Sequence, residues 1–273
     1  MFIRLIKIRL GMLIRQKEVL FWSIIFPIFL SGFLYLSAMG GNKAQTAISS
    51  ELQIQENVLY VEKVFKDVQE IEHNRLYFLT IIILMCYITG FTGIQEIEAY
   101  SLKASAKAVR HILAPISMAY QTLNSLCACW LFSMGCIGIL LIHIRGILSI
   151  TLSGNIMGWL LVIGLGTLSG ILCGMIMGNN GRCKRATKQG LMAVFAVGSC
   201  ILGGLVNPSI KFQMDYNFPV LSKIYPPLAL IDALHTLNTY GMTQRFYKDI
   251  LAIILMNAIG IGILSFLLRR NRL

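Results

Sequence analysis

The chain has 273 residues, of which 56% are hydrophobic and 13% are charged, and its formal net charge is +12. A soluble domain of this length would carry about twice that share of charged residues, so the composition excludes an ordinary soluble domain. The seven cysteines lie in apolar segments or, for Cys183, in a basic turn. We therefore expect polarizable packing residues rather than a disulfide framework, a zinc site or a redox site.

Six segments of the chain contain no Asp, Glu, Lys or Arg, and each approaches the ~20 residues that a helix needs to cross a bilayer. They are residues 19–39, 76–95, 119–142, 155–178, 191–208 and 251–268. We expect one all-α polytopic domain over residues 1–273, with six transmembrane helices. Pumps and proton-coupled carriers usually bury charged groups at the membrane midplane, so any energy for transport by this chain must come from elsewhere.

Residues 1–18 combine apolar residues with spaced cations ahead of the first span. Arg4, Lys7, Gly11 and Arg15 follow one helical stripe, which predicts a helix lying in the cytoplasmic interface. The alternative is a plain extension of the first span. Arg9 falls outside the stripe, and its long side chain could carry the charge out to the interface. Within the first span, Pro27 predicts a kink.

The connection at residues 43–75 is the most acidic part of the chain, and its apolar residues between Leu59 and Val68 suggest a short amphipathic helix. This segment is either solvated structure or a contact for a substrate.

The connection at residues 96–117 has the clearest pattern of the loops. One row at helical spacing is apolar and an adjacent row is basic, namely Leu102, Ala106, Val109 and Leu113 beside Lys103, Lys107 and Arg110. Pro115 ends the pattern. These rows predict a short amphipathic helix at the inner surface, which either rests on lipid or docks a cytoplasmic partner.

The fourth span carries glycines four residues apart, at Gly166, Gly170, Gly174 and Gly178. Small residues at this spacing let another helix approach closely. We favour packing within one subunit over a dimer seam.

The outer segment at residues 209–249 is too long for a turn and is apolar from Phe218 to Leu237. Pro219, Pro226 and Pro227 interrupt it, which predicts one or two short re-entrant helices that dip into the outer leaflet. Asp232 and His235 lie three residues apart there, and a local hydrogen bond is favoured over a catalytic dyad.

The connections between spans fall into two sets of different charge. One set holds fifteen basic and three acidic residues, whereas the other holds nine of each. Because basic residues collect in cytoplasmic connections, both termini are expected in the cytoplasm. This distribution explains the net charge by topology, and no nucleic-acid partner is expected.

Sequence motifs for enzyme chemistry are missing. The chain contains no G-x-x-x-x-G-K-[ST], no H-E-x-x-H and no G-x-S-x-G, and the predicted spans hold no paired carboxylates. We therefore expect no enzyme activity and no catalytic, cofactor-binding or metal-binding residues in this chain.

Four features of the chain are similar to one family. They are a basic interfacial helix leading into Phe21, Trp22, Phe26 and Pro27, a helical loop ending in Ala114-Pro115-Ile116-Ser117, six spans with both ends inside, and a proline-broken outer segment with Tyr225-Pro226-Pro227. Together they resemble ABC-2 type permeases, the transmembrane subunits of ATP-binding-cassette exporters. The resemblance covers nearly the whole chain.

This resemblance implies a cell-membrane permease of a bacterial plasma membrane, in which two permease subunits form a homo- or heterodimer. Separate ATPase subunits would bind ATP and Mg²⁺, and the substrate would be an amphipathic or hydrophobic peptide, antimicrobial, drug or lipid-like compound. The ATPase-coupling residues would be Glu98, Leu102, Lys103, Ala106, Lys107, Val109, Arg110 and Leu113. Candidates for lining the pathway are Trp22, Phe26, Tyr87, Gln121, Asn124 and Asn257.

A second interpretation is a non-transporting scaffold, immunity or sensor subunit that binds a ligand at the outer face. The acidic residues between Glu51 and Glu72 would suit a cationic ligand. Stoichiometric binding of an ATPase would distinguish the two interpretations.

Overall fold

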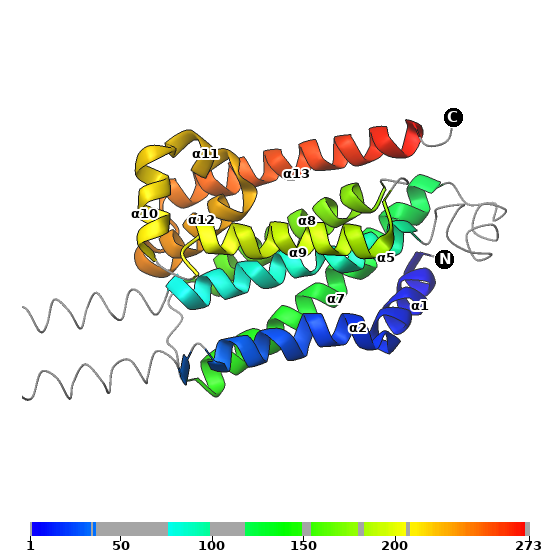
Figure 1. Cartoon of the computed structure of the whole chain (residues 1–273), viewed down its shortest axis with the longest axis horizontal. Helices are drawn as coiled ribbons and strands as arrows, with labels where there is room; N and C mark the ends of the chain where they lie inside the picture. Colours follow the sequence, from blue (N-terminus) through cyan, green and yellow to red (C-terminus); the bar gives the residue numbers. More distant parts are fainter. Residues whose placement is uncertain are drawn as a thin grey trace, which may run out of the picture.

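The computed structural model describes residues 2–33, 35, 36, 76–98, 118–148, 154–179, 183–205 and 208–270. Within these ranges every regular element is a helix, and the longer helices run along the long axis of the molecule (Figure 1). The start of α1 (Phe2–Arg15) and the end of α13 (Gln244–Arg270) lie at the same end of the bundle. The expected all-α class is confirmed for the described part of the chain.

Within the described ranges, four helices are long and apolar enough to cross a membrane, namely Leu76–Glu98, Tyr120–Gly146, Ile156–Gly178 and Gln244–Arg269. The first ends in α5 (Gly90–Glu98), the second lies within α7 (Met118–Gly146), the third is α8 (Ile156–Gly178), and the fourth is nearly all of α13. Their lengths match the thickness of a bilayer core. They correspond to the second, third, fourth and sixth expected spans, and they mark the chain as a multi-pass helical membrane protein.

The first expected span is helical but irregular. It comprises α2 (Lys17–Leu20), a π-helical segment η1 (Phe21–Ile25) and a helix over residues 26–33 that continues through 35 and 36. The wide π turn directly precedes Pro27, whose ring and missing N–H disfavour a regular turn at this place. The chain is extended at Gln16, and Figure 1 shows α1 turned away from the line of α2. The basic N-terminal helix is therefore separate from the first span.

The fifth expected span is shifted towards the N-terminus. The helix α9 (Arg185–Leu202) begins at Arg185 rather than at Leu191, and it ends before Gly203 rather than at Pro208. Gly204 has a φ of +95°, a conformation that glycine adopts readily and that stops a helix. The early start places Arg185 and Lys188 in the first turn, and α9 is not among the candidate spans found in the described residues.

Residues 208–240 fold as three helices, α10 (Pro208–Asn217), α11 (Pro219–Ile224) and α12 (Pro226–Tyr240). The sequence predicts one or two short helices here, whereas the structure has three. Each of them begins at a proline, which is favourable in the first turn of a helix because the missing N–H needs no partner there. The helix α12 is mostly buried, and it packs against α8, α9 and α13. The acidic segment 43–75 and the predicted helix between Leu59 and Val68 lie outside the described residues.

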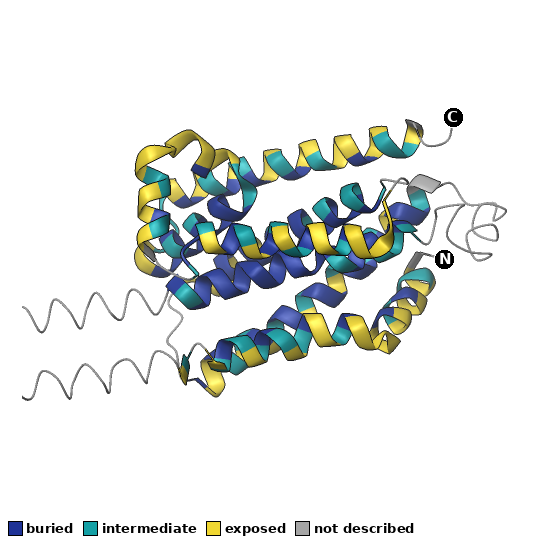
Figure 2. Cartoon of the chain, in the orientation of Figure 1, coloured by how far each residue is buried: buried dark blue, intermediate teal, exposed yellow. Residues whose placement is uncertain are grey.

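The helix Leu76–Glu98 lies at the centre of the bundle. Most of its length is dark blue in Figure 2, and its side chains from Ile81 to Tyr87 are essentially inaccessible. The most apolar part of this helix is 89% buried, whereas the corresponding part of α13 is only 22% buried. The core therefore forms around Leu76–Glu98, and α13 packs on its periphery.

Candidate functional site

The glycine stripe of α8 lies against the central helix. A Cβ atom added to Gly170 would come 2.0 Å from the carbonyl oxygen of Cys86, and one added to Gly174 would come 1.9 Å from that of Gly90. Gly166 faces Cys86, and Gly178 faces Ile94. The predicted close approach is thus made inside this subunit, backbone against backbone.

This seam has a second glycine side that the sequence analysis does not single out. A Cβ atom on Gly90 would come 2.8 Å from the carbonyl oxygen of Gly170, and one on Gly93 would come 2.5 Å from that of Ile171. Glycines on both helices therefore bring the end of the central helix close to α8. The spacing Gly90-x-x-Gly93 carries too weak a signal to reveal this contact from the sequence.

Beyond the seam, the last turn of the central helix carries Glu96 and Glu98 into a group of charged and polar side chains. We call this group the base cluster, and its members are Arg9, Glu18, Glu96, Glu98, Ser125, Arg185 and Lys188. It joins α1, α2, α5, α7 and α9 at the end of the bundle where α1 begins and α13 ends (Figure 1).

Glu96 connects the N-terminal helix to the bundle. One carboxylate oxygen accepts a hydrogen bond from the Arg9 guanidinium at 2.7 Å and another from the Ser125 hydroxyl at 3.0 Å. The side chains of Arg9 and Glu96 are only 9% and 12% exposed. Arg9 therefore does not reach out to the interface as the sequence suggests, because a carboxylate from the central helix meets it inside the protein.

Glu98 connects the central helix to α9. Its Oε1 lies 3.0 Å from the Lys188 ammonium, and its Oε2 lies 3.6 Å from Arg185. Lys188 also donates to the carbonyl oxygen of Gly178 at 2.7 Å. A cation at this place satisfies a free carbonyl at the C-terminus of α8 and offsets the negative end of its dipole.

The base cluster fixes helices relative to one another, and its chemistry is structural. Its nearly buried carboxylates accept charge-assisted hydrogen bonds from cations on other helices, so both charges are compensated. No group of three or more His, Cys, Asp or Glu side chains suited to a metal ion occurs among the described residues. Of the predicted coupling residues, Glu98 lies in this cluster, and the other seven lie outside the described ranges.

One feature of the sequence could have revealed the base cluster. The basic set of connections contains only three acidic residues, Glu18, Glu96 and Glu98. All three pair within the cluster, although Glu18 is exposed and its contact with Arg185 is long, at 3.9 Å. Rare acids in an otherwise basic set are thus a signal for ion pairs between helices.

The six candidates for lining a pathway come from the first expected span, the central helix, α7 and α13. Tyr87 is buried, and its hydroxyl lies 3.0 Å from that of Ser169. Asn257 donates to the carbonyl oxygen of Leu165 at 3.1 Å, which ties α13 to α8. Trp22 is 42% exposed, and its ring lies beside those of Phe26 and Phe91. Gln121 and Asn124 are buried on α7.

Comparison of the chain with protein-family models, with curated proteins and with solved structures finds no match. The fold indicates a multi-pass helical membrane protein, and the part of the chain that the structure describes contains four candidate spanning helices and a charged cluster at one end of the bundle.

Proposed function

We propose that this chain is the transmembrane permease subunit of an ATP-driven exporter of the ABC-2 type. In this proposal the chain spans the membrane six times with both termini in the cytoplasm, and it pairs with a second permease subunit. Separate ATPase subunits bind ATP and Mg²⁺ and supply the energy. The substrate is an amphipathic or hydrophobic molecule that moves out of the cell.

The base cluster is the observation that carries this proposal. Segment 99–117, which contains the predicted coupling helix, begins directly after Glu98. The preceding turn is held to α1 through Glu96 and Arg9 and to α9 through Glu98 and Lys188. A displacement of segment 99–117 would therefore act on three helices together, and this is the connection that a subunit driven from outside the membrane needs.

The spanning helices support the same proposal. Their Asp, Glu, Lys and Arg residues lie within two turns of a helix end, as with Glu96 and Glu98 in one helix and Arg245, Lys248 and Asp249 in another. A carrier driven by an ion gradient needs ionisable groups deeper in the membrane. An external ATPase removes that need, and the chain itself is expected to catalyse no reaction.

Affinity purification of the tagged, full-length protein from its native membrane tests this proposal, with partners identified by mass spectrometry. A stoichiometric partner with a P-loop is the expected result, and a second six-span relative among the partners would indicate a heterodimer. Recovery of the intact protein without any ATPase would contradict the proposal and favour the scaffold or sensor interpretation.

The variant Arg110→Glu tests the coupling segment. Reversal of this charge should abolish the stimulation of the ATPase by the permease, while membrane insertion continues. Lys17→Glu serves as the matched control, because it likewise reverses a positive charge, at an exposed residue outside the base cluster. Unchanged transport and unchanged ATPase binding in Arg110→Glu would contradict a coupling role.

A further inference from the structure

The end of the bundle that carries α10 presents positive charge to its surroundings. Within residues 208–250, Lys223, Arg245 and Lys248 are exposed, whereas the three aspartates are only partly exposed. Lys223 and Arg245 both act electrostatically on the Asp249 carboxylate, so these cations of α11 and α13 lie near one another. A surface with this charge is suited to an acidic partner.

A buried cation engages two of the three aspartates. The Lys211 ammonium lies 2.8 Å from both carboxylate oxygens of Asp215 and 2.7 Å from Oδ1 of Asp232. The hydroxyl of Ser222 donates a hydrogen bond to Asp215. Burial raises the pKa of Asp232, and the charge of Lys211 opposes that rise. Lys211 therefore neutralises acidic charge inside the protein, and the exposed cations determine the charge of the surface.

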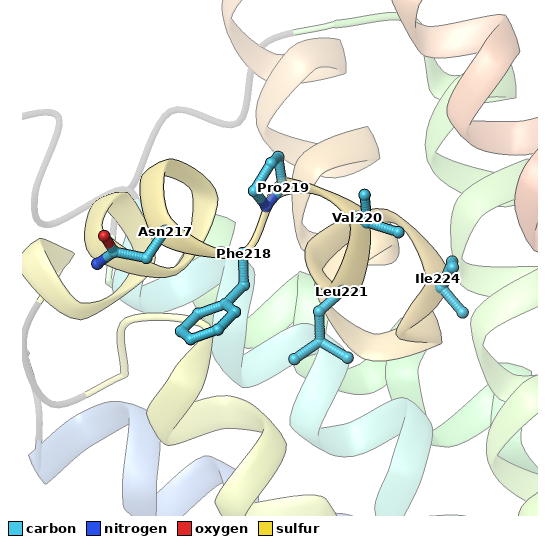
Figure 3. Close-up of a pocket in the computed structure, with 6 residues that line it drawn as sticks. All are labelled: Asn217, Phe218, Pro219, Val220, Leu221 and Ile224. Atoms are coloured by element: carbon cyan, nitrogen blue, oxygen red, sulfur yellow. The ribbon is translucent and has the colours of Figure 1, made fainter.

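An apolar hollow of about 400 Å³ lies on α11, the helix that carries Lys223. Its lining residues are Asn217, Phe218, Pro219, Val220, Leu221 and Ile224 (Figure 3). Val220 and Ile224 are 68% and 63% exposed. The neighbouring helix α10 also exposes Gln213. Side-chain amides beside apolar groups favour cover by protein over cover by hydrocarbon, where an amide lacks a hydrogen-bond partner.

Residues 37–75 leave and re-enter the bundle at this same end (Figure 1). They connect the helix that continues through residue 36 with the central helix, which begins at Leu76. One turn into the central helix, the Thr80 hydroxyl lies 3.5 Å from the carbonyl oxygen of Gly203, shortly before α10. An extended residue adds up to about 3.3 Å and a helical one about 1.5 Å, so a segment of this length reaches α11.

The sequence of this segment complements the surface of α11. Residues 51–72 hold six acidic and two basic residues. Val61, Val64, Phe65 and Val68 follow helical spacing and predict one apolar row. An acidic stretch with an apolar row matches an apolar hollow flanked by cations in both charge and polarity. Because the two belong to one chain, their association is intramolecular and needs only modest contact energy.

We propose that residues 51–72 of this chain dock on α11, with their apolar row in the hollow and their acidic residues beside Lys223, Arg245 and Lys248. The partner of this surface is thus a segment of the same chain. Docking neutralises the acidic segment from within, so a soluble cationic ligand has to displace it from α11. The inference concerns the packing of the chain itself, and it holds or fails independently of the permease proposal.

Photo-cross-linking from the hollow tests this docking in the full chain. Benzoylphenylalanine is placed at position 220, and the protein is reconstituted in vesicles of phosphatidylcholine and phosphatidylglycerol. After illumination, digestion and mass spectrometry identify the linked peptides. The same probe at Leu255, which is 57% exposed on α13, is the control and should link to lipid.

Linkage of position 220 to a peptide from residues 51–72, at the mass of a single chain, is the expected result. Lipid adducts like those of the control would overturn the proposal. Linkage to a second copy, or only to residues outside 51–72, would do the same. Absence of any adduct would also overturn it, because the hollow would then face water.

Two variants distinguish docking from simple proximity. Phe65→Ser removes the largest member of the apolar row and should lower the yield of the intramolecular link about tenfold, because burial of a Phe side chain is strongly favourable. Lys223→Glu should lower the yield about threefold, the effect expected of one exposed ion pair. Lys184→Glu, a charge reversal at an exposed residue before α9, is the matched control. Unchanged yields in the first two variants would contradict docking through these contacts.

Discussion

The central helix Leu76–Glu98 and the peripheral helix α13 are both long and apolar, but they differ in burial. The most apolar part of the central helix is 89% buried, whereas the most apolar part of α13 is only 22% buried. Hydropathy therefore does not decide which helix forms the core. The central helix has glycine neighbours that let α8 approach and two carboxylates that meet cations from distant helices. By contrast, the glycine Gly262 of α13 faces open space.

The variant Gly174→Val should have the largest effect on stability, because it disrupts the contact between α8 and the central helix. Its Cβ would lie 1.9 Å from the carbonyl oxygen of Gly90, so the two backbones must separate. Loss of more than about 3 kcal/mol in the free energy of unfolding is expected. Unfolding in detergent measures it. Gly262→Val, placed on α13 where nothing lies within 4 Å, is the control. Equal losses in the two variants would contradict the proposed seam.

The variant Arg9→Met removes the cation from Glu96 and should cost about 3 kcal/mol, because it leaves a nearly buried carboxylate without its partner. The double variant Arg9→Met, Glu96→Gln should recover much of that loss, since no charge remains. A double-mutant cycle on unfolding measures the coupling between the two residues. Additive losses would show that the pair does not join α1 to the bundle.

The variant Lys188→Met should cost less, about 1 to 2 kcal/mol. Arg185 remains near Glu98, but the carbonyl oxygen of Gly178 loses its hydrogen bond. Hydrogen exchange at the last turn of α8 is a local readout and should become faster. An exchange rate equal to that of the unmodified protein would rule out the capping role of Lys188.

The variant Leu255→Ala on α13 should have the smallest effect, within about 0.5 kcal/mol, because the side chain is 57% exposed. Ile253→Ala on the same helix removes a fully buried side chain and should cost about 2 kcal/mol. Thermal unfolding of the two variants compares the faces of α13. A larger loss at Leu255 would indicate that another subunit covers this face.

Much of this fold could be predicted from the sequence, because a bilayer imposes length and apolarity on spanning helices. The segments beginning at Leu76, Ala119 and Asn155 start within one residue of candidate spans, whereas the helix expected from Leu251 already begins at Gln244. The glycine spacing in α8 likewise predicts a close helix contact. The sequence predicts too late a start for α9, because Arg185 and Lys188 resemble loop residues until their partner Glu98 is known.

The base cluster could be predicted only in part. Glu98 was placed in the coupling segment from the family resemblance, whereas Arg9 and Glu96 are 87 residues apart and no periodicity connects them. The same holds for Lys211 and Asp232, which the proline-broken segment brings together only after three helices have formed. Local patterns determine the helices, but ion pairs between helices depend on the packing of the whole bundle.

The rate of ATP hydrolysis in the reconstituted complex tests the central claim most directly. The measurement compares the unmodified permease with the double variant Arg9→Met, Glu96→Gln, in which this one ion pair is neutralised. Both proteins are assembled with the co-purified ATPase in vesicles. The account predicts that this variant binds the ATPase but loses the permease-dependent stimulation of hydrolysis. Equal stimulation by the two proteins would contradict transmission of force through the base cluster.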